Sequence, residues 1–317
     1  MIDSILEFGV INEVYNLLKG SKLGPFFIYI ILYKRIVNMK INSELPNCML
    51  DLNNQLNEYD FVLFHLYESN EQYREYYLNQ RKIYPDRLMI FDNSAYEYYV
   101  KGESLNLHLY YEAICELRPD YYILPDVLMD KDKTIQGVSD FLQLYELGIA
   151  LNTGKSQPLA VAQGMKSSEL LECLSIYKSI GITNICIPFH NRFFYEMGQI
   201  VHKDIQQHFV DVYGSVLTED HMYAMGRVQF IYNNITKLSD FNYIHLLGSH
   251  CPFEKSLYSS IIDSMDTGYP VKCAIVGERL GEEKCKPNVI IDEFLDKELD
   301  KNTIELIEQN VTTFRNL

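Results

Sequence analysis

The sequence predicts an α/β protein whose simplest architecture is a closed (β/α)8 TIM barrel. Short apolar runs of strand length alternate with segments whose apolar residues recur at helical spacing, as in a parallel sheet covered by helices. About eight such runs are present when two early ones are counted. An open doubly wound sheet is the alternative. No GxGxxG or P-loop spacing follows any run, which disfavours a nucleotide-binding sheet of that kind.

The predicted elements follow one another along the whole chain. Strands are expected at 48–51, 61–65, 88–92, 118–126, 158–164, 184–188, 241–248 and 261–266. Helices are expected at 2–18, 68–82, 107–117, 132–147, 168–180, 195–237, 254–260 and 301–314. We therefore expect an N-terminal extension over 1–45, a barrel domain over 46–280 and a helical C-terminal tail over 281–317.

Charge and cysteine usage limit the classes of function. The chain carries 28 Lys and Arg against 43 Asp and Glu, a formal net charge of −15. An acidic surface repels polyanions, so it disfavours a protein that coats DNA or RNA, but not an enzyme that grips one nucleotide. The seven cysteines include no CxxC pair, so neither a disulfide framework nor a structural zinc site is predicted.

The start of the chain carries no secretory signal pattern, and the apolar run at 26–33 is too short to cross a bilayer. We therefore expect a cytoplasmic protein with no membrane partner.

Polar residues stand at the ends of several predicted strands. Asp92 ends one strand, Asp126 another and Gln163 a third, while Asp263 and Asp266 close the last. A single Asp at such a position is typically a turn former. In a barrel, however, the carboxyl ends of all strands meet at one face, where active sites lie. Several carboxylates converging there with an amide predict a site.

Two chemistries fit a cluster of carboxylates without other metal ligands. A pair can serve as nucleophile and acid/base at the anomeric carbon of a sugar. Alternatively, the carboxylates could chelate Mg²⁺ and act on phosphate. Lys and Arg are sparse beside these strand ends, which disfavours phosphate. Asp and Gln with an aromatic such as Tyr96 suit the edge and face of a planar base, so the pattern favours a nucleobase attached to a sugar.

Five segments, in order over roughly 88–272, resemble motifs of the tRNA-guanine transglycosylase superfamily, whose phage and bacterial branches include DNA 7-deazaguanine transglycosylases. Asp92-Asn-Ser-Ala-Tyr-Glu97 resembles the family's Asp-Ser-Gly-Gly-(Phe/Tyr)-Gln motif. Pro119–Asp126 resembles the segment that places a base-recognising Asp. Ala160–Gly164 resembles the family's Gly-Ile-Val-Gln-Gly, and Ile244–Gly248 resembles its His-Tyr-Leu-Met-Gly. Ile262–Pro270 resembles the family's Ile-Asp-Met-Phe-Asp-Cys-Val-x-Pro.

The resemblance implies a catalytic pair. Asp266 would be the nucleophile that attacks C1′ of the ribosyl unit, because Pro270 preserves the spacing of the motif. Asp263 is the rival nucleophile, or else a hydrogen-bonded supporting residue. Asp92 would be the general acid/base for the departing and incoming bases. The implied reaction exchanges guanine for a 7-deazaguanine base through a covalent Asp-glycosyl intermediate.

The resemblance also implies a base pocket. Asp126 and Gln163, with Gly164 beside them, would read the edge of the base, and Tyr96 and Leu247 would sandwich its faces.

Phe189 and Gly248 complete the substrate-binding residues that the resemblance implies. Pro188-Phe189 stands where the family offers backbone amides to the base carbonyl. Proline has no N–H, so one of those contacts is lost here.

Departures from the family pattern bear on the substrate. The Cys-x-Cys-x-x-Cys…His zinc site is missing, and its subdomain helps to hold tRNA, so DNA or a free nucleoside is favoured over tRNA. A basic cluster lies near the end of the predicted barrel and consists of Lys272, Arg279, Lys284 and Lys286. It either contacts phosphates or belongs to a solvated loop in which its charges balance nearby glutamates.

The expected partners are guanine or a 7-deazaguanine base and a DNA (or tRNA) substrate, with no cofactor and no metal. A homodimer is left open. A non-catalytic nucleobase- or nucleotide-binding protein with the same pocket and a nucleoside hydrolase are the alternative functions.

Overall fold

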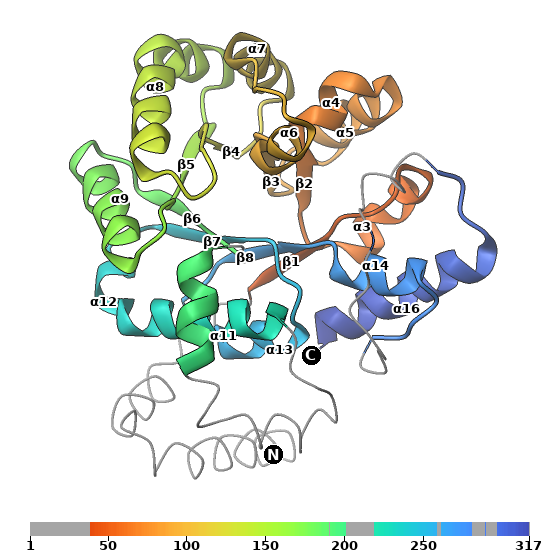
Figure 1. The fold of residues 1–317 in the computed structure, drawn as a ribbon. Coiled ribbons are helices and arrows are strands. Elements are labelled where there is room, and N and C mark those ends of the chain that lie inside the picture. Colours follow the sequence, from red (N-terminus) through yellow and green to blue (C-terminus); the bar gives the residue numbers. More distant parts are fainter. Residues whose placement is uncertain are drawn as a thin grey trace, which may run out of the picture.

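Eight parallel strands form a nearly closed barrel surrounded by helices, so the chain adopts the predicted (β/α)8 TIM fold (Figure 1). The computed structural model describes residues 39–189, 191–200, 219–258, 261–280, 289 and 297–316. Neighbouring strands pair in the order β1-β8-β7-β6-β5-β4-β3-β2, always in parallel. The strands are β1 (Lys40–Ser43), β2 (Asp60–Leu63), β3 (Met89–Asp92), β4 (Tyr121–Ile123), β5 (Gln157–Val161), β6 (Asn184–Pro188), β7 (Tyr243–Leu247) and β8 (Ser264–Thr267).

Polar groups join β1 to β2, the two strands between which no ladder runs. The backbone N–H of Glu58, just before β2, donates to Ile41 O at 3.2 Å, and Glu58 Oε2 accepts from Ile41 N at 2.8 Å. The Asn57 side chain accepts from Ser43 N at 2.7 Å and donates to Ser43 O at 2.9 Å. These contacts satisfy backbone groups of β1 that a neighbouring strand would otherwise satisfy.

The helices lie outside the strands and bury them (Figure 1). Strands β2, β3, β6 and β8 are buried at every position, as expected for a parallel sheet covered by helices. None of the described helices is long and apolar enough to cross a membrane. The helices are α3 (Asn53–Leu56), α4 (Phe64–Ser69), α5 (Glu71–Ile83), α6 (Ala95–Lys101), α7 (Leu107–Leu117), α8 (Lys131–Thr153), α9 (Ser167–Ser179), α11 (Glu219–Asn233), α12 (Ile235–Leu238), α13 (Pro252–Leu257), α14 (Tyr269–Ile275) and α16 (Lys301–Asn316).

Local sequence signals fix the ends of several helices. The side chains of Asn70, Asn106 and Asp130 accept hydrogen bonds from backbone N–H groups in the first turns of α5, α7 and α8. Gly102 and Gly154 end α6 and α8 in the left-handed conformation that glycine adopts most easily.

The first predicted strand is wrong. Residues 48–51 belong to the 3-10 helix η1 (Asn47–Leu52), and the first strand of the barrel is instead β1. Hydropathy misses β1 because it ends in Asn42 and Ser43, two buried polar residues, of which Asn42 donates its side-chain amide to Tyr59 O at 2.8 Å. The barrel thus begins at Lys40, inside the segment assigned to the N-terminal extension.

The last strand and the long helical region also differ from the prediction. Strand β8 starts only at Ser264, so 261–263 precede it. The helix predicted over 195–237 is helical at 192–200 and again in α11 and α12, and residues 201–218 lie outside the described ranges. The helix predicted at 2–18 also lies outside them.

Helix α16 confirms the helix expected near the C-terminus and packs against α14. Ile307, Val311 and Phe314 form its fully buried stripe. Between them, the Asn310 amide donates to Pro270 O at 3.2 Å and to Glu278 O at 3.0 Å. Apolar and polar contacts together fix this helix on the barrel.

Charged groups lock the loop before β4, at the end of the barrel opposite the carboxyl ends of the strands. Asp120 accepts hydrogen bonds from Arg81 Nη2 at 2.8 Å, Lys155 Nζ at 2.9 Å and Met89 N at 2.9 Å. Burial of the carboxylate opposes ionisation, but these hydrogen bonds outweigh it and lower the pKa of Asp120.

We expect Asp120→Asn to lower the free energy of unfolding by about 1–3 kcal/mol near neutral pH, because charge-assisted hydrogen bonds are lost. A lowered pKa contributes stability above the unfolded-state value of about 3.9 and loses it as the pH falls. The difference from the parent protein should therefore shrink below about pH 3 in urea unfolding. Asp240→Asn, which breaks only the exposed pair with Lys178, is the control and should change stability by less than about 0.5 kcal/mol. Equal effects of the two variants would contradict the prediction.

Candidate active site

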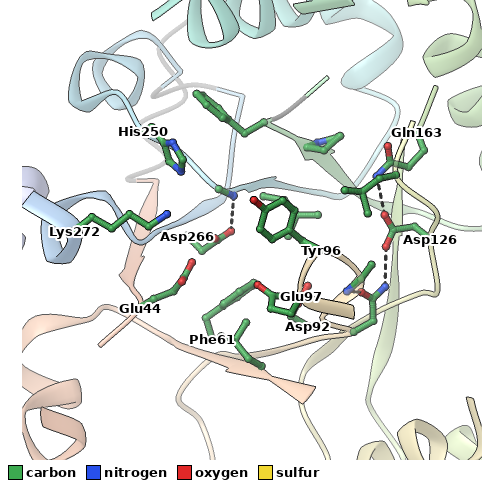
Figure 2. Close-up of a pocket in the computed structure, with 18 residues that line it drawn as sticks. Glu44, Phe61, Asp92, Tyr96, Glu97, Asp126, Gln163, His250, Asp266 and Lys272 are labelled. Carbon is green, nitrogen blue, oxygen red and sulfur yellow. Dashed lines mark hydrogen bonds between the residues drawn. The ribbon is translucent and has the colours of Figure 1, made fainter. Parts of the chain in front are cut away.

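A cavity of about 190 Å³ opens at the carboxyl end of the barrel (Figure 2). Each of the eight strands, or the loop that follows it, supplies at least one lining residue. Most of the residues predicted from the sequence meet here: Asp92, Tyr96, Asp126, Gln163, Phe189, Leu247, Gly248, Asp266 and Lys272. The fold thus brings together side chains that lie up to 180 residues apart, from Asp92 to Lys272.

Asp92 is the last residue of β3 and is buried, with 9% of its surface exposed. Its Oδ2 accepts from Ser94 N at 2.7 Å. Ser94 has a left-handed φ of 57° and is held by His65, whose N–H and Nδ1 lie 3.1 and 2.9 Å from Ser94 Oγ. Burial and then the negative charge of Glu97 raise the pKa of Asp92 well above its usual range, so this carboxyl group keeps its proton to a higher pH than an exposed aspartic acid does.

Asp266 lies in β8 and is 4% exposed. Its Oδ1 lies 3.1 Å from His245 Nε2 and accepts from Gly248 N at 2.9 Å. Gly248 has a φ of 66°, a left-handed conformation that suits glycine and that turns its N–H toward the carboxylate. Asp92 and Asp266 therefore face one cavity from very different surroundings.

Asp126 follows β4, and two amide side chains hold its two oxygens. Asn93 Nδ2 donates to Oδ1 at 2.9 Å, and Gln163 Nε2 donates to Oδ2 at 2.7 Å (Figure 2). The amide oxygens face backbone donors: Gln163 Oε1 accepts from Met129 N at 3.0 Å, and Asn93 Oδ1 accepts from Ala95 N at 2.8 Å. The remaining lone pairs of Asp126 are acceptors in fixed positions. Gln163 therefore holds Asp126 as well as lining the cavity.

Apolar and aromatic side chains form the walls. Tyr96 lines the cavity with its ring directed into it (Figure 2), and 54% of this residue is exposed. Leu247 and Phe189 line the cavity from β7 and the loop after β6, and Phe61 lines it from β2. A flat ring could be enclosed between these walls, as the sequence predicted for a base.

A buried ion pair fixes the loop after β7. Arg227 on α11 and Glu254 on α13 are fully buried and form a bidentate pair at 2.7 and 2.8 Å. The guanidinium also donates to Leu247 O at 3.1 Å and to Gly248 O at 2.7 Å, and it lies 4.8 Å from the Phe189 ring centroid. This arginine thus sets the position of the Gly248 N–H that reaches Asp266. Sequence analysis missed the pair because no strand end or motif signals it.

Acidic side chains dominate the cavity. Five line it: Glu44, Asp92, Glu97, Asp126 and Asp266. Among the described residues that line it, Lys272 is the only Lys or Arg. His250 adds an imidazole whose Nδ1 lies 3.3 Å from Asp220 Oδ2. Such a field favours a neutral or cationic ligand and opposes phosphate. Over the described ranges, no group of three or more His, Cys, Asp or Glu side chains has the arrangement of a metal site.

Three predicted site residues lie elsewhere. Asp263 precedes β8 at the amino end of the strand, where its Oδ2 accepts from Ile244 N at 2.8 Å, as a supporting residue would. Arg279 lines a separate cavity against Glu305 and Glu308 of α16. Gly164 does not line the central cavity; its carbonyl accepts from Asn191 Nδ2.

Several residues of the cavity were not assigned by the sequence. Glu97, which lines the cavity, and His245, which is fully buried behind it, lie inside the matched motifs, so their chemistry was visible but was given no role. Glu44 was missed together with β1, the strand that it follows. His250 has no signal of its own, since a single histidine after a strand is common in loops.

No family model and no curated protein matches this chain. The site must therefore be interpreted from its own geometry.

We expect Asp92→Asn to stabilise the fold while removing an ionisable group. A raised pKa means that the folded protein keeps a proton which the unfolded chain releases above about pH 3.9, so stability falls as the pH rises toward the folded-state pKa. The variant should therefore gain about 1–3 kcal/mol in urea unfolding near pH 8 and less near pH 4.

The control is Asp86→Asn in an exposed turn, which should leave stability within about 0.5 kcal/mol. Loss of stability in Asp92→Asn near pH 8, relative to that control, would show that the carboxylate is not destabilised by its surroundings.

Proposed function

We propose that the chain is a nucleic-acid base transglycosylase, a pentosyltransferase that exchanges guanine for a 7-deazaguanine base through a covalent ester on Asp266, with DNA favoured over tRNA. The observation that carries the proposal is the presence of two unlike carboxyl groups, Asp92 and Asp266, in one cavity. A protonated acid and a hydrogen-bonded carboxylate are the two parts that a retaining transfer at an anomeric carbon requires.

The two steps balance between these groups. In the first, Asp266 forms a bond to C1′ as the bond from C1′ to the base nitrogen breaks, and the departing guanine takes the proton of Asp92. In the second, Asp92 accepts a proton from the incoming base, whose nitrogen bonds to C1′ while the ester bond breaks. Positive charge develops on the sugar in both steps, and the carboxylate-rich cavity would stabilise it.

Asp126 supports guanine as the base. Its fixed acceptor lone pairs suit an edge with two adjacent N–H donors, which guanine and 7-deazaguanine share. A base without those donors would leave the remaining lone pairs of Asp126 without partners, and sites built to bind a substrate N–H typically reject an analogue without it by roughly 10⁴-fold or more. The apolar walls of Tyr96 and Leu247 would contact the faces of the base.

A free nucleoside is the second candidate substrate. One lysine against five carboxylates offers little attraction to a phosphate backbone at the cavity itself. On duplex DNA, the target nucleotide would have to be flipped out, at a cost of a few kcal/mol. Transfer to water would make the same residues a nucleoside hydrolase.

Incorporation of labelled guanine into duplex DNA, tRNA and 2′-deoxyguanosine tests the proposal. We expect Asp266→Asn to abolish incorporation, by roughly 10³-fold or more, since no ester can form. Asp263→Asn is the matched control at the other end of the same strand, and it should keep activity within about tenfold because its carboxylate does not face the cavity.

Mass spectrometry of the protein after denaturation should show a sugar adduct on the parent chain and on Asp263→Asn only. Guanine binding without adduct or exchange would instead identify a non-catalytic base-binding protein. Exchange that persists in Asp266→Asn would refute the assignment of the nucleophile.

A further inference from the structure

A chain of polar groups runs from Tyr243, a partly buried residue at the amino end of β7, to Asp266. Tyr243 OH donates to Ser264 Oγ at 2.7 Å, Ser264 Oγ lies 2.8 Å from His245 Nδ1, and His245 Nε2 lies 3.1 Å from Asp266 Oδ1. The register of β7 and β8 creates this chain, because it pairs His245 with Ser264. Ser264 and His245 are fully buried. The catalytic scheme above assigns none of these three residues a role.

The direction of the hydrogen bonds follows from the donor at the start of the chain. Since Tyr243 donates to Ser264, the hydroxyl proton of Ser264 is left to donate to His245 Nδ1. His245 then carries its proton on Nε2 and donates it to Asp266 Oδ1. The imidazole thus presents an N–H to the carboxylate.

Aromatic packing fixes the imidazole ring. The Phe61 ring stacks on it at 5.4 Å between centroids and 29° between planes, and Tyr59 meets it edge-on at 6.4 Å. Phe61 separates this ring from the substrate side by lining the cavity itself. His245 therefore cannot turn away from Asp266 without disrupting the core.

The two oxygens of Asp266 are consequently unlike. Oδ1 receives the His245 N–H and the Gly248 N–H, whereas no described residue donates a hydrogen bond to Oδ2. We propose that His245 is a positioning residue which, with Gly248, reserves Oδ2 as the nucleophilic oxygen and stabilises Oδ1 when the glycosyl ester breaks. This inference rests on the proposed function and deepens it.

The chemistry makes the two steps respond differently. Forming the ester converts Oδ1 into a carbonyl oxygen, and the two N–H donors then bind a weaker acceptor. Breaking the C1′–Oδ2 bond returns the electron pair to the carboxylate, so the same donors stabilise the charge that develops on Oδ1. Loss of the His245 donor should therefore slow breakdown of the ester more than its formation.

The test follows the covalent adduct after the protein is mixed with guanine-containing DNA or 2′-deoxyguanosine and then chased with labelled guanine. In His245→Leu, we expect ester breakdown to slow by roughly 10²–10³-fold, as for removal of one donor from an oxyanion site, so that the adduct accumulates. His245→Gln retains an N–H donor and should recover most of that loss. Ser264→Ala, which frees the His245 tautomer, should lie between the two.

Tyr110→Phe provides the structural control, because it removes a buried hydroxyl whose single proton faces two backbone carbonyls, those of Phe91 and Ile123. It should lower thermal stability without adduct accumulation. Thermal unfolding and circular dichroism establish that each variant is folded.

The outcomes separate the two proposals. A parent chain that forms no adduct and exchanges no guanine refutes the transglycosylase proposal. A parent chain that forms the adduct, together with His245 variants whose two steps slow equally or not at all, refutes the role of His245 alone. Equal defects in folded His245→Gln and His245→Leu would also refute that role.

Discussion

The burial of carboxyl groups in one small cavity, and after it the repulsion among them, is the constraint on which the site depends. Burial and the charges of Glu97, Asp266 and Asp126 all raise the pKa of Asp92. The barrel opposes this repulsion by fixing Asp92 at the end of β3, so the fold's stability sustains an unfavourable arrangement. The same acidic groups would stabilise the positive charge that develops on the sugar as a glycosidic bond breaks. The cost of the site and its proposed reactivity therefore have one physical origin.

Neutral donors hold two of these carboxyl groups. Asp126 is held by two side-chain amides, and Asp266 by an imidazole and a backbone N–H. The buried arginine of this region, Arg227, is directed to Glu254 and to backbone carbonyls instead. A guanidinium on Asp266 would neutralise the proposed nucleophile. The Arg227–Glu254 ion pair instead holds Asp266 indirectly, because it fixes the loop whose Gly248 N–H binds that carboxylate.

The sequence predicted the barrel and most of the cavity, because both follow from local patterns. Apolar runs that end in a polar residue locate Asp92, Asp126 and Gln163 at strand ends, and parallel strands bring such ends to one face. Position within a short strand was less predictable. Asp263 and Asp266 lie three residues apart, yet β8 is short enough to place them at opposite ends.

Strand β1 shows why the remaining part escaped prediction. It pairs with β8 so that Asn42 lies opposite Asp266, and Glu44 follows it into the cavity. Across the seam, the side chains of Asn57 and Glu58 bind backbone groups of β1, and the Asn42 side chain donates to Tyr59 O. Polar side chains on both sides of the seam thus take the place of the strand pairing found elsewhere in the barrel. Hydropathy does not identify a short strand that ends in such buried polar residues.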